Sequence, residues 1–191
     1  MATHPLKIIL ASSSPRRRQI LNDCGFDFDV CIPDEDAEDG ICSGETPTEF
    51  VARLAYQKAR NVAKKFDTGL FLGCDTVAEI QGQILGKPRD RTHAREMLTQ
   101  LSGEEHRVFS GLCLYQRPGD EFKSNVEVTS LWMAELSESQ IEDYLETGLW
   151  QGKAGAFGLQ DGMDWITLIQ GSESNVIGLP LELLKKMLVE F

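Results

Sequence analysis

Residues that could bind an anion gather at positions 12–18, where an apolar run gives way to three serines, a proline and three arginines. Pro15 suits the first position of a helix, and Ser14 before it can cap the helix N-terminus. Arginines close to that end oppose the helix dipole, but they become favourable when an anion binds there. Free N–H groups, the Ser12 hydroxyl and the guanidinium groups therefore predict a phosphate site. A capped helix with solvated arginines is the alternative interpretation.

Two further charged residues stand where the pattern calls for apolar ones. Asp75 interrupts the apolar run 70–80, which predicts a buried strand, and a buried carboxylate is costly unless it is paired or holds a metal. Lys58 lies on the apolar stripe of a helix predicted to begin at Thr46-Pro47 and to stop near Gly69. Its ammonium must either reach solvent or meet a negative partner.

An acidic segment precedes this helix. Residues 33–45 contain six carboxylates, a density that repels itself unless the loop is solvated or binds a cation. Oxygen ligands from this loop and from Asp75 would suit a hard divalent cation, and nearby basic residues would suit a polyphosphate. The basic candidates are Arg16, Arg17, Lys58 and Lys87.

The elements that must position these residues are typical of an α/β fold. A strand at 7–11, a helix at 15–24 and a half-buried strand at 26–32 open the chain. The later predicted elements are a hairpin of strands 70–80 and 84–85, a helix capped by Asp90, long antiparallel strands near 106–116 and 122–133, a helix opened by Ser137, a strand at 165–169, a polar loop at 171–180, and a last helix from Pro180. The glycine-rich segment 152–162 either lets backbone approach a ligand or is an irregular loop.

Composition narrows the class of protein. The chain has 191 residues, enough for one domain or two lobes that share a core, and its net charge of -11 argues against a nucleic-acid polymer as partner. No apolar run approaches membrane-spanning length, and the first seven residues lack the apolar core of a signal peptide, so a cytoplasmic protein without a membrane partner is expected. The five cysteines form no C-x-x-C pair, which argues against a zinc site or a disulfide framework.

Several familiar catalytic and nucleotide-binding motifs are absent. The sequence contains no G-x-x-x-x-G-K-[ST], and no G-x-G-x-x-G follows a predicted strand. It also lacks a G-x-S-x-G elbow and an H-E-x-x-H helix. P-loop, dinucleotide-binding, serine hydrolase and zinc peptidase interpretations are therefore unsupported.

Six short motifs occur along the chain: L-A-S-x-S-P-R-R from Leu10, R-L-A-x-x-K-A from Arg53, G-x-D-T-V from Gly73, G-K-P-R-D from Gly86, K-A-G-A-F-G-L-Q from Lys153 and N-V-I-G-L-P from Asn175. In this order and spacing they resemble the Maf family of nucleoside triphosphate pyrophosphatases. The resemblance covers almost the entire chain. It implies one domain over residues 1–191, with an elongated mixed β-sheet and flanking helices that form two lobes around a cleft, similar to inosine triphosphate pyrophosphatase.

The resemblance also implies an activity and its residues. The expected reaction is hydrolysis of a nucleoside triphosphate to the monophosphate and pyrophosphate with Mg²⁺ or Mn²⁺, and a homodimer is expected. Asp75 and Lys87 fall on the catalytic positions, and Ser12, Arg17, Lys58 and Lys87 on those that bind phosphate. The metal would be held by Asp75 and one loop carboxylate. Because Ala37 separates Asp36 from Glu38, either acid could take this role, and we favour Glu38.

Three positions bear on the substrate. Arg16, Thr76 and Gln160 match the branch that resembles dTTP and UTP pyrophosphatases, which favours dTTP, UTP and modified pyrimidine nucleotides. A glutamine can pair with a base edge as donor and acceptor. The alternatives are an enzyme for 7-methyl-GTP or a noncanonical purine, and a non-catalytic nucleotide-binding regulator of cell division.

Overall fold

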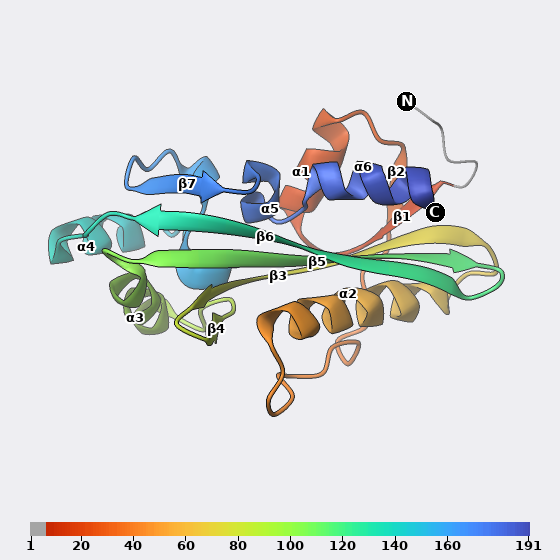
Figure 1. Ribbon diagram of the computed structural model, residues 1–191, viewed down its shortest axis with the longest axis horizontal. Helices are drawn as coiled ribbons and strands as arrows, with labels where there is room; N and C mark the ends of the chain where they lie inside the picture. The colour runs from red at the N-terminus through yellow and green to blue at the C-terminus, as the bar shows by residue number, and fades with distance from the viewer. Residues whose placement is uncertain (1–6) are drawn as a thin grey trace. The chain divides into compact units, whose positions relative to one another are not determined.

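The computed structural model describes residues 7–191, and its seven strands form one mixed sheet (Figure 1). The strands are β1 (Ile8–Ala11), β2 (Phe28–Val30), β3 (Gly69–Ile80), β4 (Gln83–Leu85), β5 (Glu105–Arg117), β6 (Glu121–Met133) and β7 (Ile166–Gln170). Their order is β2-β1-β3-β5-β6-β7, with β4 paired to β3. β1 is parallel to β2 and β3, whereas β4 is antiparallel to β3 and β7 to β6.

Six α-helices flank this sheet, so the predicted α/β class with a mixed sheet and flanking helices is confirmed. They are α1 (Pro15–Asp23), α2 (Pro47–Ala63), α3 (Arg91–Leu101), α4 (Glu138–Glu146), α5 (Glu173–Ile177) and α6 (Leu181–Glu190). The helix starts predicted at Ser14, Thr46 and Ser137 are all capped, the last by a capping box between Ser137 and Gln140. Ser14 accepts from the N–H of Arg17, and Thr46 forms a capping box with Glu49.

Four predicted segments differ from the structure. The helix expected to stop near Gly69 ends at Ala63, because the N–H of Lys65 turns back to the carbonyl of Val62. The strand expected at 26–32 shrinks to Phe28–Val30, because the N–H of Phe26 instead closes the end of α1 on the carbonyl of Leu21. The prediction of a loop throughout 171–180 is wrong, since Ser172 caps the short helix α5 through the N–H of Asn175. The glycine-rich segment 152–162 contains two 3₁₀ turns, η1 (Ala154–Ala156) and η2 (Leu159–Asp161).

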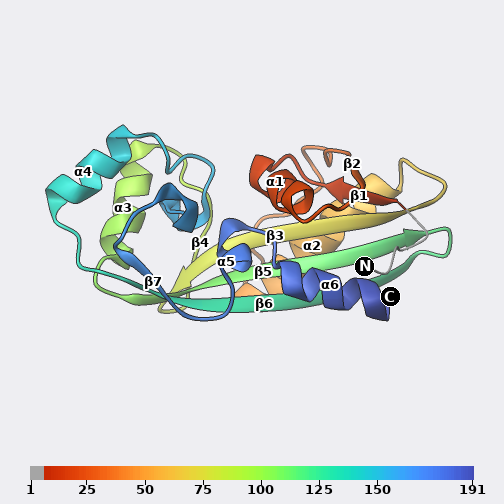
Figure 2. The same cartoon turned by 90° about the horizontal axis from the view of Figure 1, so that it is seen from above.

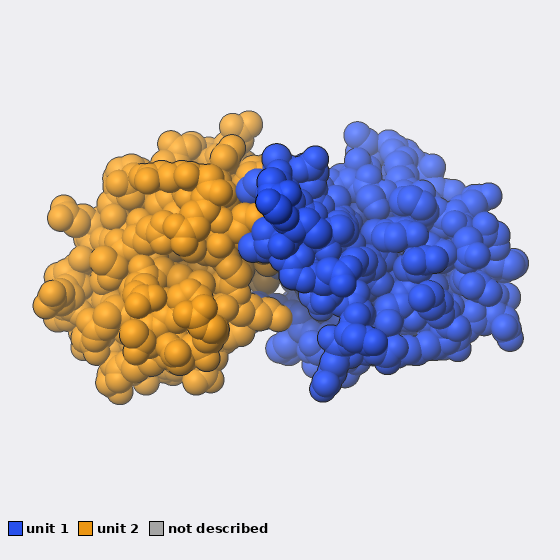
Figure 3. Space-filling view, turned by 90° about the horizontal axis from the view of Figure 1, so that it is seen from below, with its two compact units in different colours: residues 1–75, 110–127, 178–191 blue, residues 76–109, 128–177 orange. Residues whose placement is uncertain are grey.

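The chain divides into two compact units, which are coloured separately in Figure 3. Unit 1 comprises the described residues up to 75 together with 110–127 and 178–191. Unit 2 comprises residues 76–109 and 128–177. Within the described part of the chain, no helix is both long and apolar enough to cross a membrane. The expectation of no signal peptide falls mostly on residues 1–6, which lie outside the described residues.

Unit 1 has an apolar layer on each face of its part of the sheet. Helices α1 and α6 cover one face, and α2 covers the other, as Figure 2 shows from above. The side chains of β1 and β3 alternate between the two layers: Leu10 and Leu72 pack under α1 and α6, while Ile9 and Phe71 pack under α2. Both faces of these strands are therefore buried, as is usual for parallel strands.

Two glycines bring α2 into direct contact with the sheet. A Cβ placed at Gly73 of β3 would lie 2.0 Å from the carbonyl oxygen of Ala55, and one at Gly111 of β5 would lie 2.2 Å from that of Val51. Such distances leave no room for any side chain. The helix backbone thus rests on the strands at these two points, which fixes its position along the sheet.

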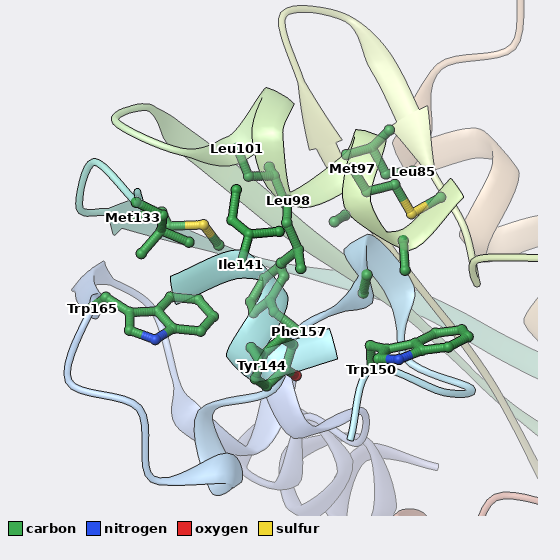
Figure 4. Packing of buried hydrophobic residues seen from close by; sticks show 14 of the residues in the cluster. Leu85, Met97, Leu98, Leu101, Met133, Ile141, Tyr144, Trp150, Phe157 and Trp165 are labelled. Atoms are coloured by element: carbon green, nitrogen blue, oxygen red, sulfur yellow. The ribbon is translucent and has the colours of Figure 1, made fainter. Parts of the chain in front are cut away.

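Unit 2 has its own hydrophobic core, which is shown at close range in Figure 4. Helices α3 and α4 contribute Leu98 and Ile141, and the aromatic rings of Trp150, Phe157 and Trp165 fill the space beside them. Because Phe157 is anchored here, the glycine-rich segment that contains it is held against the core. The segment is therefore not a wholly irregular loop, since it forms two 3₁₀ turns beside this core.

Candidate active site

Three charged side chains of unit 1 meet at one point. The ammonium of Lys58 on α2 lies 2.6 Å from Oδ1 of Asp75 on β3 and 3.1 Å from Oε2 of Glu38 in the acidic loop. Lys58 is 8% exposed and Asp75 9%, whereas the Glu38 side chain is 44% exposed. One cation therefore serves two carboxylates, of which one is buried and one faces solvent. This answers the two questions raised by the sequence: Lys58 does not reach solvent, and the carboxylate of Asp75 is paired.

The contact between α2 and β3 explains why Lys58 reaches Asp75. Gly73 touches the backbone of α2 at Ala55 and, within 2.9 Å of a built Cβ, at the nitrogen of Ala59. Asp75 lies two residues after Gly73 on the same face of the strand, and Lys58 lies next to Ala59. With the helix fixed at this point, the Lys58 side chain can only extend over the following residues of the strand.

Arg17 is buried beside the middle of the same strand. Its Nη1 donates to the carbonyl of Cys74 (2.7 Å) and to the Ser12 hydroxyl (3.2 Å), and its Nε donates to the carbonyl of Gly178 (2.8 Å). Ser12 also accepts from the N–H of Ser14 at 3.1 Å. The interpretation as a set of solvated arginines thus fails for Arg17, which links β1, β3 and the segment before α6.

The other two arginines of this turn are placed differently. Arg16 is half-buried, and Arg18 is exposed and donates to the carbonyl of Ser13 at 3.4 Å. Only Arg17 of the three is drawn into the interior. The turn therefore presents Ser12 and Arg17 next to Cys74, whose chain neighbour is Asp75.

The acidic loop is ordered against α2. Arg53 binds Glu45 through two hydrogen bonds of 2.7 and 2.8 Å, and Lys65 binds Asp34 at 2.7 Å. Each of these hydrogen bonds lowers the pKa of the carboxyl that accepts it. Among the carboxylates between these two ends, Glu38 is the one that the structure places on Lys58. From the sequence, either Asp36 or Glu38 could be the second carboxylate of the site, and Glu38 was favoured.

The remaining candidate residues belong to unit 2. Thr76 is half-buried and directly follows Asp75, while Lys87 and Gln160 are exposed. The segments that carry Lys87 and Gln160 are tied together, because the N–H of Gly155 donates to the carbonyl of Gly86 at 3.1 Å.

The conformation of Gln160 depends on a glycine. A Cβ built on Gly158 would lie 2.7 Å from Nε2 and 2.9 Å from Oε1 of Gln160, so the amide folds over the bare Cα. The neighbouring residue, Asp161, is held in place, because its two carboxylate oxygens accept hydrogen bonds from the ammonium of Lys153 and from the hydroxyl of Tyr144. The side chains of Lys153 and Asp161 are 8% and 3% exposed. Gln160 is thus an exposed side chain directly before a residue that two buried contacts hold in place.

The two carboxylates beside Lys58 fit a hard divalent cation. Mg²⁺ is usually held by one or two carboxylates, and its other positions are filled by water and substrate phosphates. Within residues 7–191 there is no group of three or more histidine, cysteine or acidic side chains suited to a metal, so a site made wholly of protein ligands is not formed there. A metal held by Asp75 and Glu38 would take its remaining ligands from water and, when substrate is bound, from phosphate oxygens.

Sequence reasoning missed two features of these sites. Arg53 opens the motif R-L-A-x-x-K-A, but no binding role was predicted for it. A polar or basic residue recurs every four positions after the acidic segment, at Arg53, Gln57, Asn61 and Lys65. That spacing is the signal that could have identified the helix face that binds the loop. The buried pair of Lys153 and Asp161 carried no comparable signal, because an eight-residue separation across a glycine-rich segment corresponds to no regular element.

Comparison with known proteins matches nearly the whole chain to one family. The model of the family described as "Maf-like protein" matches residues 7–191. A dTTP/UTP pyrophosphatase of Rhodopirellula baltica is 51% identical over 98% of this chain and 83% of its own length. A dTTP/UTP pyrophosphatase of Geotalea uraniireducens is 41% identical over 91% of this chain and 89% of its own.

A solved structure supports the fold. The HAM1 protein from Coxiella burnetii superposes with a TM-score of 0.54 over 97% of this chain and 100% of that protein. At 17% identity this likeness concerns the fold alone.

Proposed function

The chain belongs to the Maf family and is a nucleoside triphosphate pyrophosphatase, and we propose that it converts dTTP and UTP to the monophosphate and pyrophosphate. The proposal extends to modified pyrimidine nucleotides. The observation that carries it is the buried carboxylate of Asp75 beside Lys58, with Glu38 at the solvent side of the same ammonium. Such a pair is expensive to bury for stability alone, and it suits a site that handles polyphosphate and water.

Asp75 is the proposed general base. Its carboxylate orients the attacking water and accepts a proton as the water oxygen bonds to the α-phosphorus. The bond between the α-phosphorus and the bridging oxygen breaks, and pyrophosphate leaves. The ammonium of Lys58, which donates to Oδ1 at 2.6 Å, holds this carboxylate in a fixed orientation.

The basic residues stabilise the charge on the phosphates. Lys58, Lys87 and Arg17 are the proposed contacts, with the Ser12 hydroxyl beside Arg17. Fixed positive charge aimed at the leaving group is the main demand of such a displacement. A Mg²⁺ or Mn²⁺ ion held by Asp75 and Glu38 would add Lewis-acid stabilisation of phosphate charge.

Selection of the base is assigned to Arg16, Thr76 and Gln160. The support for this assignment is the identity of these residues. The contacts of Lys153 and Tyr144 with Asp161, which directly follows Gln160, also hold this part of the chain in place. An amide can satisfy both a donor and an acceptor on a pyrimidine edge, and a substrate that leaves such a group without its partner is rejected strongly.

The test is pyrophosphate release from dTTP, UTP, CTP, GTP and 7-methyl-GTP with Mg²⁺, with Mn²⁺ and after chelation. Selective release from dTTP and UTP that disappears in Asp75→Asn is the expected result. Release mainly from 7-methyl-GTP or a purine would overturn the proposed substrates, and nucleotide binding without any release would overturn the proposed reaction. Light scattering on the same preparation tests the homodimer that we propose with it.

A further inference from the structure

The acidic loop follows α2 in a fixed register. Arg53, Gln57 and Asn61 stand four residues apart and form a row about 12 Å long on the helix, and Lys65 follows two residues after the helix ends. The loop runs in the opposite direction to the helix. Its late residue Glu45 lies at Arg53, and its early residue Asp34 lies at Lys65 and at Asn61, whose side-chain oxygen accepts from the N–H of Asp34 at 3.0 Å.

Arg53 fixes one end of this register. Its Nε and Nη2 bind the two oxygens of Glu45 at 2.7 and 2.8 Å, and Nη2 also donates to the carbonyl of Gly40 at 2.9 Å. The planar guanidinium is the group that can make this two-point contact, and a lysine would keep the charge without the geometry. Arg53 thereby holds both the side chain and the backbone of the loop.

Gln57 aligns the loop with the helix next to the site. Its Nε2 donates to Oδ2 of Asp39 at 2.6 Å, and its Oε1 accepts from the N–H of Asp39 at 3.3 Å. Asp39 directly follows Glu38, and Gln57 directly precedes Lys58. Two neighbours on the helix are thus matched with two neighbours on the loop, and Glu38 falls on Lys58 as a consequence.

We propose that Arg53 and Gln57 are positioning residues, which hold Glu38 beside Lys58 and Asp75 and make Glu38, rather than Asp36, the second carboxylate of the site. The loop carries six carboxylates and would move away from α2 without this attachment. The Glu38 side chain is 44% exposed and so has little packing of its own to keep it in place. The inference rests on the proposed function only in giving Glu38 a role toward a divalent cation.

Two measurements test the proposal without relying on turnover. Digestion by a protease that cuts after acidic residues reports on the loop, and titration with Mn²⁺ alone, followed by electron paramagnetic resonance, reports on the carboxylates. Arg53→Gln and Arg53→Lys should both speed cleavage within 33–45 and weaken Mn²⁺ binding, by ~10-fold or more for Arg53→Gln. Arg91→Gln is the matched control, since Arg91 also binds two glutamates but in unit 2, and it should change neither quantity.

A double-mutant cycle separates positioning from general destabilisation. If Arg53 acts through Glu38, Arg53→Gln should add little to the loss of Mn²⁺ affinity already caused by Glu38→Gln. Additive losses, unchanged cleavage of the loop, or an equal effect of Asp36→Asn and Glu38→Gln would each overturn the proposal. A wild-type protein that binds Mn²⁺ yet releases no pyrophosphate would overturn the proposed function, while the cleavage and Mn²⁺ results would still decide the role of Arg53.

Discussion

Lys58 and Asp75 form a buried ion pair in which Nζ and Oδ1 are 2.6 Å apart. Lys58 belongs to helix α2 and Asp75 to strand β3, so the pair joins two separate elements of the fold. Removal of one member of such a pair leaves the other buried without its partner, and this usually costs more than removal of both. The pair therefore links the stability of unit 1 to the chemistry proposed for it, and the two effects can be separated.

Asp75→Asn should abolish pyrophosphate release and lower the free energy of unfolding by roughly 1–3 kcal/mol, with Glu38 remaining as a partial partner for Lys58. The double variant Lys58→Met/Asp75→Asn should recover most of that stability and none of the activity. Urea denaturation followed by circular dichroism measures the first quantity, and the release assay the second. Turnover retained by Asp75→Asn would remove Asp75 from the role of general base.

Gly158→Ala should alter base selection with little effect on stability. The added methyl group would lie 2.7 Å from Nε2 of Gln160, and the flexible amide can move away at a cost below about 1 kcal/mol. We expect the ratio of kcat/KM for UTP to that for CTP to change by ~10-fold, because the amide would no longer lie where a base edge needs it. In a Gln160→Ala background the same change should have no further effect; a similar shift there would show that Gly158 acts by another route.

His106 should make the folded state sensitive to acid. Burial lowers its pKa to about 4, and its ring packs edge-on against Phe157 at 5.1 Å. The folded pKa lies below the ordinary value of 6.5, so between these values the unfolded chain binds the proton and stability falls as the pH falls. The loss from this group is about 2 kcal/mol between pH 7 and pH 5. Unfolding free energies of wild type and His106→Leu at both pH values give the contribution by difference, and parallel losses in the two proteins would refute it.

Gly73→Ala should displace α2 from the sheet. A Cβ at this position would meet the carbonyl oxygen of Ala55 at 2.0 Å, a contact with backbone that no rotamer change relieves. We expect a loss of about 3 kcal/mol or more of unfolding free energy and a further fall in activity per folded molecule, because Lys58 moves with the helix. Gly40→Ala is the control, since a Cβ there meets nothing within 4 Å. Full stability of Gly73→Ala would contradict the close approach of helix and strand.

The sequence was informative where a charged residue stood at a position that the hydrophobic pattern predicts to be buried. Lys58 on an apolar stripe and Asp75 in an apolar strand could each be recognised as costly, and the structure pairs them. Their pairing could not be derived, because it depends on where α2 lies along β3, and that is set by a backbone contact at Gly73. Local pattern reports burial, whereas the choice of partner is a tertiary property.

Short elements and long-range bonds escaped prediction for a similar reason. The five residues of α5 are fewer than a helical pattern needs to show a period, so the cap at Ser172 was the only available signal. Arg17 was correctly identified as a residue out of place at a helix N-terminus. Its carbonyl acceptors at Cys74 and Gly178 belong to distant parts of the chain, and nothing in the motif around it specifies them.

The bond from Arg17 to Gly178 has a consequence for biosynthesis. Its acceptor is separated from it by 161 residues, and Gly178 also accepts from the thiol of Cys74 across 104 residues. At ordinary rates of translation, the ribosome adds Gly178 roughly 5 to 20 seconds after Cys74. During that interval the nascent chain contains Asp75, Lys58 and Arg17 but not the carbonyl that completes the hydrogen bonding of the guanidinium. The proposed catalytic carboxylate is thus synthesised early, and its surroundings are completed only when one of the last segments of the chain folds back.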